Sequence, residues 1–342
     1  MAVMELSLTS ESLPILLDRA IAARAAFFDE RHQAAFRLFN GFAEGCPTLV
    51  IDLYAATAVL YNHANPPEHG LPQVATAQTT LQERFPWIHT IILKTRHTTS
   101  MPEQQGVLLA GSTPDRRIRE HGVWYAVDLM MNRDASLYLD TRNLRQWAIQ
   151  QLGGKTVLNT FAYTGSLGVA AMAGGAARVV QLDLNRRFLN IAKTSYTLNG
   201  FPINKADFQT GDFWPAINRM KRTGERFDCV LVDPPIFSAT AGGVVDLARN
   251  YTKVINKVRP LINDGGTLVA INNALFLIGR EYMAMLESIC AEGYVWIGEL
   301  IPVPDDCTGG FRASNATQIT DPAPFNHSTK IAVLRIRRKS DS

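Results

Sequence analysis

Residues 157–185 read VLNTFAYTGSLGVAAMAGGAARVVQLDLN and indicate the architecture more clearly than any other segment. The apolar runs at 156–161 and 178–184 each suit a buried strand, and the apolar residues at 167–173 between them suit a helix. Gly165 lies in the turn that joins the first strand to the helix. Two strands connected through a helix form the repeating unit of a parallel sheet. The stretch therefore predicts an α/β fold with helices on both faces of the sheet.

The same alternation continues to the C-terminus. Further strands are expected at 207–210, 227–232, 267–272, 294–302 and 330–337, and further helices at 186–199, 214–222, 245–258 and 280–292. The last two strands are separated by a long loop, 303–329, instead of a helix. We therefore expect a seven-stranded sheet whose last two strands pair antiparallel at one edge.

The residues before this region do not alternate regularly between strands and helices. They predict a helix at 13–30 and strands at 48–53, 57–63, 90–95, 106–110 and 123–131. A chain of 342 residues is also longer than one hydrophobic core usually holds. We therefore predict a small α+β domain at 1–135, for substrate recognition or dimerisation, followed by the α/β domain at 136–342.

The composition is that of a folded globular protein, with 46% hydrophobic and 19% charged residues. No apolar run is long enough to cross a bilayer, and the N-terminus lacks the features of a signal peptide. The four cysteines form no CxxC pair, which argues against a zinc site or disulfides and predicts no metal and a cytoplasmic location. The net charge of +3 permits an anionic partner such as RNA.

The turn after the first strand of the α/β domain is a candidate ligand site. Gly165 allows a ligand to approach the backbone, and the helix that follows favours a carboxylate at its N-terminus. The alternative is an ordinary strand-to-helix turn, and the two interpretations are about even on this turn alone. A dinucleotide site needs GxGxxG, but Tyr163 occupies the first glycine position of that pattern.

Carboxylates follow the next two strands. Asp183 can accept hydrogen bonds from both ribose hydroxyls of a nucleoside, and the alternative is a helix cap, for which Asn185 is better placed. Asp212, followed by Phe213, can hold the amino group and ring face of an adenine. For Asp212 alone, a helix cap is the favoured interpretation.

The fourth signal is the strongest, because FDCVLVDPPIF at 227–237 combines a buried strand with two prolines, a carboxylate and an aromatic ring. The prolines end the strand, and Asp233 then lies at the carboxyl edge of the sheet, where open α/β sheets bind ligands. Phe237 can stack on a flat base. A purely structural role for the prolines leaves Asp233 and Phe237 unexplained.

The segments LYLDTRNLR (137–145), VLNTFAYTGSLGVAAMAGGA (157–176), VVQLDLN (179–185) and VLVDPPIF (230–237) resemble the bacterial large-subunit (23S) ribosomal RNA methyltransferases. The resemblance covers residues 35–338 and implies a class I, Rossmann-like methyltransferase fold, S-adenosylmethionine as cofactor and RNA as substrate. The cofactor residues that it implies, together with the turns above, are Tyr138, Asp140, Arg142, Asn159, Phe161, Tyr163, Thr164, Gly165, Asp183, Leu184, Asp212, Phe213, Asp233 and Pro234.

That family has a 5-methylcytosine branch and a 7-methylguanine branch. The first carries an N-terminal PUA domain, for which this sequence has too few residues, and a nucleophilic cysteine after the fifth strand. Here Asn272 and Asn273 occupy the cysteine position, and only Cys307, in the 303–329 loop, is placed to replace it. Methylation of cytosine carbon 5 requires such a thiolate. The sequence therefore resembles the guanine branch more closely.

The predicted catalytic residues are Asp233, Phe237, Asn272 and Asn273. Phe237 would hold the acceptor ring, the asparagines would bind its edge, and Asp233 would accept a proton if the acceptor is an exocyclic amine. Four residues of the long loop are candidates to cover a substrate: Phe311, Arg312, Phe325 and His327. Three arginines of the N-terminal domain are candidate phosphate contacts, with a solvated loop as the alternative: Arg116, Arg117 and Arg119.

Three other functions are weighed against this one. A nicotinamide-dependent oxidoreductase is disfavoured by the missing glycines. A non-catalytic RNA-binding protein that keeps a cofactor fold, and a methyltransferase acting on a small molecule or a protein, both stay open. A homodimer is also compatible with the sequence.

Overall fold

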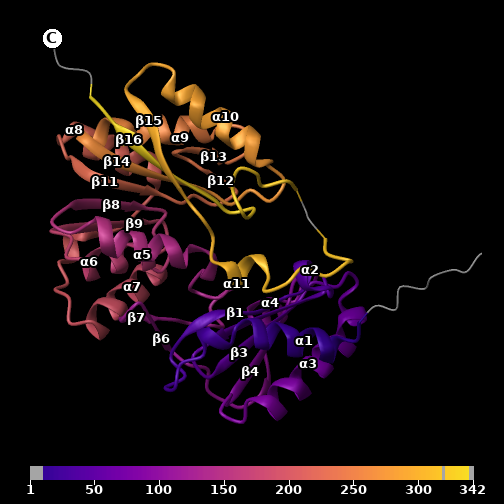
Figure 1. Cartoon of the computed structure of the whole chain (residues 1–342). Helices are drawn as coiled ribbons and strands as arrows, with labels where there is room; N and C mark the ends of the chain where they lie inside the picture. Colours follow the sequence, from indigo (N-terminus) through magenta and orange to yellow (C-terminus); the bar gives the residue numbers. More distant parts are fainter. Residues whose placement is uncertain (1–10, 318–319, 339–342) are drawn as a thin grey trace, which may run out of the picture. The chain divides into compact units, whose positions relative to one another are not determined.

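The computed structural model describes residues 11–317 and 320–338, which divide into two compact units. The first unit contains residues 11–115, 129–134 and 305–317, and the second contains 116–128, 135–304 and 320–338. This division differs in two places from the predicted domains, 1–135 and 136–342. Residues 116–128 go with the second unit, and residues 305–317 return to the first (Figure 1).

The first unit is built on a five-stranded sheet in the order β1-β2-β3-β4-β5. The strands are β1 (Ala35–Asn40), β2 (Leu49–Tyr54), β3 (Thr57–Asn62), β4 (Thr90–Thr95) and β5 (Val107–Ala110). Only β3 and β4 pair in parallel. Their connection is α3 (Leu71–Arg84), which the sequence reading missed together with β1.

Two longer helices share the core of this sheet. Apolar residues of α1 (Leu13–Ala23) and α3 belong to one buried cluster with the strands. The helix that was expected at 13–30 ends earlier, at Ala23. A short 3-10 turn follows at Ala25–Phe27. Two short helices, α2 (Gly41–Glu44) and α4 (Met101–Gln105), complete the described helices before residue 129.

The short helix α11 (Asp305–Thr308) lies beside β1 (Figure 1). The Arg37 amide donates to Asp306 Oδ2 at 2.8 Å, and Asn40 Nδ2 donates to the Cys307 carbonyl at 2.7 Å. Cys307 is fully buried there. Cys307, which the sequence placed in a long loop, thus lies in a short helix that packs within the first unit.

A buried ion pair fixes the same segment. Arg24 and Glu44 are 2.7 Å apart, with both side chains fully buried. Arg24 also donates to the Asp306 carbonyl at 3.0 Å, and Glu44 accepts from the Gly310 amide at 2.6 Å. Phe311, a candidate to cover a substrate, is partly buried and packs against the core cluster of the first unit.

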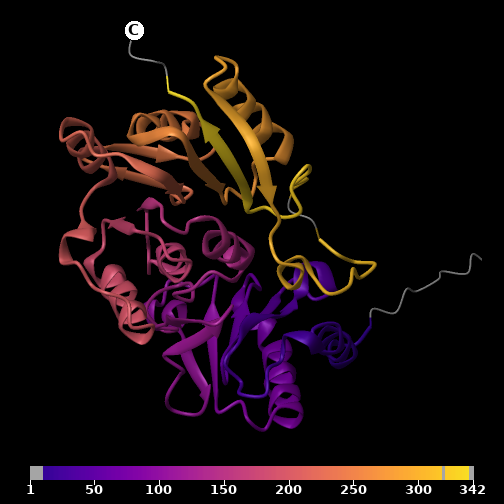
Figure 2. The ribbon, with the colours of Figure 1, turned by 60° about the vertical axis from the view of Figure 1, so that its left-hand side comes forward.

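The second unit contains the predicted seven-stranded sheet, in the order β10-β9-β8-β11-β14-β16-β15. The strands are β8 (Thr156–Thr160), β9 (Arg178–Asp183), β10 (Phe208–Thr210), β11 (Phe227–Val232), β14 (Ile262–Asn272), β15 (Val295–Ile301) and β16 (Lys330–Ile336). The first five are parallel, and β16 pairs antiparallel with both β14 and β15. In Figure 2 the yellow β16 runs opposite to the orange β15 beside it. The predicted edge hairpin is confirmed.

Helices cover both faces of this sheet. The helices are α5 (Arg142–Gln151), α6 (Ser166–Ala173), α7 (Arg186–Leu198), α8 (Phe213–Arg222), α9 (Tyr251–Val258) and α10 (Gly279–Cys290). Alternate residues of the central strands enter two different clusters: Val230 packs with α8, α9 and α10, whereas Leu231 packs with α5 and α6. Successive side chains point to opposite faces of the sheet, and helices cover both faces. Nearly every residue of a central strand is therefore buried and apolar.

Two hairpins accompany the sheet. The first is β6 (Arg117–Glu120) with β7 (Val123–Ala126), and the second is β12 (Phe237–Thr240) with β13 (Gly243–Asp246). The helix expected at 245–258 therefore begins only at Tyr251, and the strand expected at 123–131 ends at Ala126. Across the described parts of the chain, no helix has the length and apolar character needed to cross a membrane.

Candidate functional site

The turn after β8 has an unusual backbone. Phe161 and Tyr163 both adopt positive φ angles, 53° and 51°, which cost about 1–3 kcal/mol each for residues with a side chain and cluster at functional sites. Gly165 follows with φ 75° and caps α6. A Cβ atom on Gly165 would lie 2.5 Å from the Ala192 Cβ atom of α7. Both the φ angle and the close contact with α7 therefore favour glycine at this position.

Asp183, at the end of β9, faces this turn. One carboxylate oxygen accepts from the Tyr163 amide at 2.8 Å, and the other accepts from the Asn185 amide at 2.8 Å. Asn185 caps α7 through the Arg187 amide, as expected, so Asp183 is not needed for that role. Each Asp183 oxygen keeps a free lone pair for a hydroxyl. Leu184 beside it is 63% exposed, which leaves an apolar side chain at the rim of the turn.

Asn159 lies beneath the turn. Its side chain is buried and donates to Gln181 Oε1 at 2.8 Å, while Gln181 Nε2 donates to the Gly165 carbonyl at 3.2 Å. Asn159 thus supports the turn through Gln181 instead of facing the open surface.

The 138–142 segment runs along the other side of the turn. The Thr164 hydroxyl donates to the Ser136 carbonyl, and the Tyr138 and Tyr163 rings lie 5.3 Å apart. Tyr138 is exposed, whereas Arg142, the first residue of α5, is buried. Asp140 Oδ2 accepts from the Thr329 hydroxyl at 2.6 Å. The structure therefore brings the segment implied by the family resemblance to the glycine turn.

Asp212 and Phe213 occupy the start of α8. Asp212 caps the helix by accepting from the Trp214 amide at 2.8 Å, as the favoured interpretation predicted. Phe213 is buried and stacks on Phe161, with ring centroids 4.6 Å apart. The Gly211 amide donates to the Asp183 carbonyl at 2.9 Å, which places the start of α8 next to the end of β9.

Asp233 is the second carboxylate at this edge of the sheet. It follows β11, is half-buried, and precedes the buried Pro234. Burial and the nearby Asp140 carboxylate raise the pKa of Asp233 to about 7. Together Asp140 and Asp233 favour a cationic ligand group, because a positive charge relieves the repulsion between their carboxylates.

The chain after β14 is tied to the β12–β13 hairpin by Asn272. Its buried amide donates to the Leu247 carbonyl at 3.2 Å and accepts from the Ala274 amide at 3.0 Å. The Leu247 amide in turn donates to the Ile236 carbonyl at 3.0 Å. Asn272 therefore connects two loops, whereas the prediction was that it contacts a base. Asn273 Oδ1 is buried and has no hydrogen-bond partner among the described residues.

Lys330 supports the same loop from β16, and nothing in the sequence had indicated it. Its buried ammonium group donates to the Ala274 carbonyl at 3.1 Å and to the Ser328 carbonyl at 2.6 Å. Burial lowers the pKa of Lys330 to about 8. Of the other loop candidates, Phe325 packs against Tyr282 in the core, and His327 accepts from the Thr329 amide at 3.0 Å.

Two phenylalanines are exposed in the segments that follow β11 and β14. Phe237, on β12, is 63% exposed, and Phe276, in the loop after β14, is 82% exposed. Their neighbours Ile236 and Leu275 are exposed as well. Large apolar side chains gathered at one edge indicate a binding surface. The sequence reading missed Phe276, because the residues around it do not indicate that its side chain is exposed.

The cysteines offer no reactive thiol at this edge. Cys229 lies inside β11, where burial raises its pKa to about 12, and burial also raises the pKa of Cys46 and Cys290. Cys307 is buried in the first unit. The described residues also contain no group of three His, Cys, Asp or Glu side chains that could hold a metal ion.

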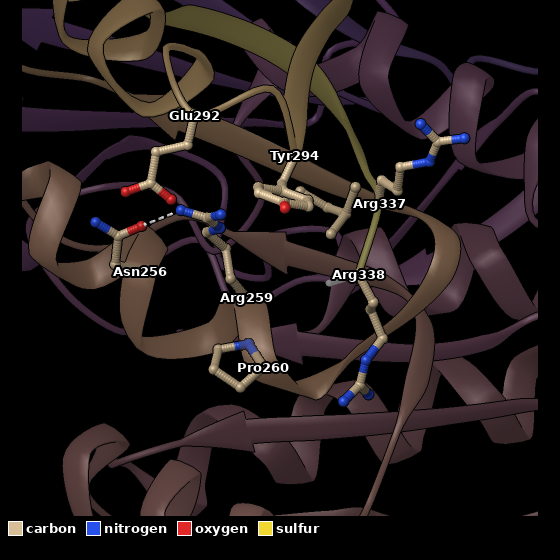
Figure 3. A pocket seen from close by; sticks show the side chains of 8 residues that line it. Asn256, Arg259, Pro260, Glu292, Tyr294, Arg337 and Arg338 are labelled. Carbon is tan, nitrogen blue, oxygen red and sulfur yellow. Dashed lines mark hydrogen bonds between the residues drawn. The ribbon is translucent and has the colours of Figure 1, made fainter. Parts of the chain in front are cut away.

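A separate pocket of about 500 Å³ lies at the opposite end of the sheet. Its residues precede β14 and β15 or lie at and after the end of β16: Asn256, Arg259, Pro260, Glu292, Tyr294, Ile336, Arg337 and Arg338. Figure 3 shows the three arginine side chains pointing in different directions around Tyr294. This pocket is therefore distinct from the site at the carboxyl edge.

Known proteins share both sequence and fold with this chain. The family model described as S-adenosylmethionine-dependent methyltransferase matches residues 74–298. The "Ribosomal RNA large subunit methyltransferase I" of Erwinia tasmaniensis is 30% identical over 242 residues, 70% of this chain and 60% of the relative. The protein of the same name from Klebsiella pneumoniae (strain 342) is 29% identical over 277 residues, 75% of this chain and 68% of the relative. The chain thus spans about 60% of the first of these relatives.

Solved structures confirm the fold. A methyltransferase crystallised with SAH has a TM-score of 0.82 at 21% identity, over 97% of this chain and 83% of that one. A S-adenosylmethionine-dependent methyltransferase from Agrobacterium tumefaciens has a TM-score of 0.60 at 19% identity, over 85% of this chain and 88% of that one. The class I methyltransferase fold is therefore shown, and with the family match the chain belongs to the S-adenosylmethionine-dependent methyltransferases.

Proposed function

We propose that this protein methylates a ring nitrogen of a base in ribosomal RNA, with guanine as the preferred base. One observation carries the proposal: the carboxyl edge of the sheet presents Asp233 with the exposed rings of Phe237 and Phe276, and no reactive thiol among the described residues accompanies them. Ribosomal RNA as the substrate rests on the names of the relatives.

The residues around the β8 turn fit S-adenosylmethionine. Asp183 has lone pairs for the ribose hydroxyls, Leu184 offers an apolar contact for adenine, and the N-terminus of α6 favours the methionine carboxylate. Asp140 and Asp233 favour the positive charges of the amino group and the sulfonium. When bound, the cofactor supplies an activated methyl group, so the protein has to align the acceptor and exclude water.

A ring nitrogen suits these residues, because it brings its own lone pair. Phe237 begins β12 and Phe276 lies in the loop after β14. Asn272 ties these two segments together, so both rings are available to hold one planar base. Asp233 can accept a hydrogen bond from the edge of the base, or a proton if the acceptor is an exocyclic amine. Carbon 5 of cytosine needs a covalent thiolate adduct, for which the described residues of this edge supply no group.

The first test is chemical. Incubation with S-adenosylmethionine and RNA that contains 5-fluorocytosine is expected to leave no cross-linked protein on a denaturing gel, because a covalent adduct requires a nucleophile. Mass spectrometry of nucleosides from methylated ribosomal RNA is expected to show a methylated guanine. A cross-linked species that is absent in Cys307→Ala, or 5-methylcytosine as the product, would overturn the nitrogen assignment.

Replacing either exposed phenylalanine tests the acceptor surface. Phe237→Ala and Phe276→Ala are each expected to lower kcat/KM for RNA by about 5- to 150-fold, since stacking contributes about 1–3 kcal/mol per base. The affinity for SAH, measured by calorimetry, is expected to stay at the wild-type level. Trp296→Ala, at an exposed aromatic of the edge strand β15, is the matched control and should retain activity. Normal methyl transfer by both variants would contradict base stacking at this surface.

The raised pKa of Asp233 predicts a pH-dependent stability. Because its folded pKa of about 7 exceeds the unfolded value near 3.8, the folded protein binds the extra proton, and this contribution is lost as pH rises through 7. Asp233→Asn removes the titration. Thermal melts without ligand should show the variant gaining in Tm relative to wild type between pH 5 and pH 8. Parallel Tm curves for the two proteins would mean that Asp233 ionises like an exposed carboxyl.

A further inference from the structure

The β6–β7 hairpin has two chemically different faces. Its turn, His121–Gly122, has φ angles of 50° and 80°, the positive values of the two-residue turns that suit tight hairpins. Side chains then alternate along β6: Arg117 and Arg119 are exposed, whereas Ile118 and Glu120 are buried. The exposed residues define what we call the outer face.

An aromatic ring organises the outer face. Trp124 pairs with Arg119 across the hairpin, and its ring centroid lies 5.6 Å from the Arg119 guanidinium and 4.7 Å from that of Arg117. Arg116 is exposed next to them. Cation–π contacts hold guanidinium groups in place without neutralising their charge.

These arginines differ from others of the second unit in lacking an acidic partner. Within residues 11–317 and 320–338, Arg116, Arg117 and Arg119 form no ion pair, whereas Arg145, Arg178 and Arg187 pair with Glu120, Asp207 and Asp128. The outer face therefore carries uncompensated positive charge beside an aromatic surface. That combination complements a polyanion with flat bases.

The hairpin is firmly attached to the methyltransferase unit. The side chain of Asn199, the C-cap residue of α7, accepts from the Trp124 amide at 2.9 Å and donates to the Trp124 carbonyl at 2.7 Å. The Ser195 hydroxyl of α7 accepts from the Ala126 amide at 2.9 Å. These bonds fix the position of the Trp124 backbone relative to α7, the helix that begins next to Asp183.

The buried face reaches the cofactor segment. Glu120 accepts two hydrogen bonds from Arg145, at 2.6 and 2.8 Å. Arg145 also donates to the Tyr138 carbonyl at 2.9 Å and to the Thr141 hydroxyl at 2.8 Å. The outer face is thus held at a defined position relative to the segment that carries Tyr138 and Asp140.

We infer that the outer face of the β6–β7 hairpin binds the sugar–phosphate backbone of the RNA substrate, with Arg116, Arg117 and Arg119 on phosphates and Trp124 stacked on an unpaired base. This rests on the proposed function, which names RNA as the substrate. It assigns the contact to the methyltransferase unit, whereas the sequence alone had placed these arginines in the N-terminal domain.

The test uses the full chain and a fluorescein-labelled single-stranded RNA of mixed sequence, about 30 nucleotides long. Anisotropy titrations over a range of salt concentrations compare wild type with Arg117→Gln/Arg119→Gln, which removes two charges and keeps polar side chains that can still donate hydrogen bonds. The double variant should bind about tenfold more weakly at low salt. Its slope of log affinity against log salt should be smaller by about 1.4, because each phosphate contact contributes about 0.7 on a single strand.

Two further variants sharpen the test. Arg222→Gln/Arg280→Gln removes two exposed charges elsewhere in the second unit and should leave both affinity and slope at wild-type values. Trp124→Leu should weaken binding without changing the slope, because stacking releases no counterions. SAH affinity and Tm, measured for each protein, should stay unchanged in the two arginine variants.

The outcomes separate this inference from the proposed function. Wild-type affinity and slope in Arg117→Gln/Arg119→Gln, or an equal loss in Arg222→Gln/Arg280→Gln, would overturn the docking face while RNA remains the substrate. If the wild-type protein itself binds no RNA but methylates a protein or a small molecule, the proposed function fails and the docking face fails with it.

Discussion

Replacing Glu120 with alanine is expected to destabilise the second unit by about 3–5 kcal/mol, the usual cost of removing one partner of a buried ion pair. The Arg145 side chain is fully buried, and Glu120 supplies its only acidic partner among the ion pairs of the described residues. Without that carboxylate, Arg145 keeps its charge in a place that water does not reach. Its remaining acceptors, the Tyr138 carbonyl and the Thr141 hydroxyl, are uncharged.

Urea unfolding with the intrinsic tryptophan signal gives the free energy of unfolding. Arg187→Ala is the matched control, because it breaks an ion pair with Asp128 that is largely exposed and contributes about 0–1 kcal/mol. The double variant Glu120→Ala/Arg145→Met should recover much of the loss, since it removes both charges from the interior. A loss below about 1 kcal/mol in the single variant would show that water reaches Arg145.

The second large effect is expected at Gly165. Its φ is 75°, and a Cβ atom at this position would lie 2.5 Å from the Ala192 Cβ, so Gly165→Ala both strains the backbone and pushes α7 away from the turn. Overpacking costs about 1–3 kcal/mol, and the left-handed conformation adds about 1 kcal/mol. Because Asp183 precedes α7 and bonds the turn, we also expect SAH affinity to fall at least tenfold.

Gly175→Ala separates the two causes. Gly175 has a similar φ of 84°, but a Cβ atom there would meet nothing within 4 Å. It should therefore show the backbone strain alone, with normal SAH binding by calorimetry. Equal losses of stability and affinity in both variants would mean that the contact with Ala192 contributes nothing.

The sheet of the second unit could be predicted from the sequence because its signals are local. Each central strand packs its alternate residues against different helices, so the run is apolar throughout and stands out from the helices around it. Residues directly after these strands, such as Asp183 and Asp233, then meet at the carboxyl edge by topology alone.

The features that sequence reading missed depend on contacts between distant residues. Residues 237–246 form a hairpin whose base is held by Asn272, so helical spacing near Val245 was misleading. Phe276 is a candidate for base binding because its ring is exposed, and the sequence alone does not indicate the exposure of a single side chain. The assignment of 116–128 to the second unit follows from Asn199, Ser195 and Arg145, all far along the chain.

The return of residues 305–317 to the first unit has a consequence for biosynthesis. The N-terminal part of a chain leaves the ribosome first, and domains usually fold in the order in which they emerge. Here the Asp306 carbonyl that binds Arg24 is synthesised 282 residues after its partner, and the Gly310 amide that binds Glu44 follows its partner by 266 residues. We therefore expect the nascent first unit to stay incompletely folded until residues 305–317 have emerged from the ribosome. Truncation after residue 304 is therefore expected to destabilise α1 and α2, because Arg24, directly after α1, and Glu44 of α2 would lose these contacts.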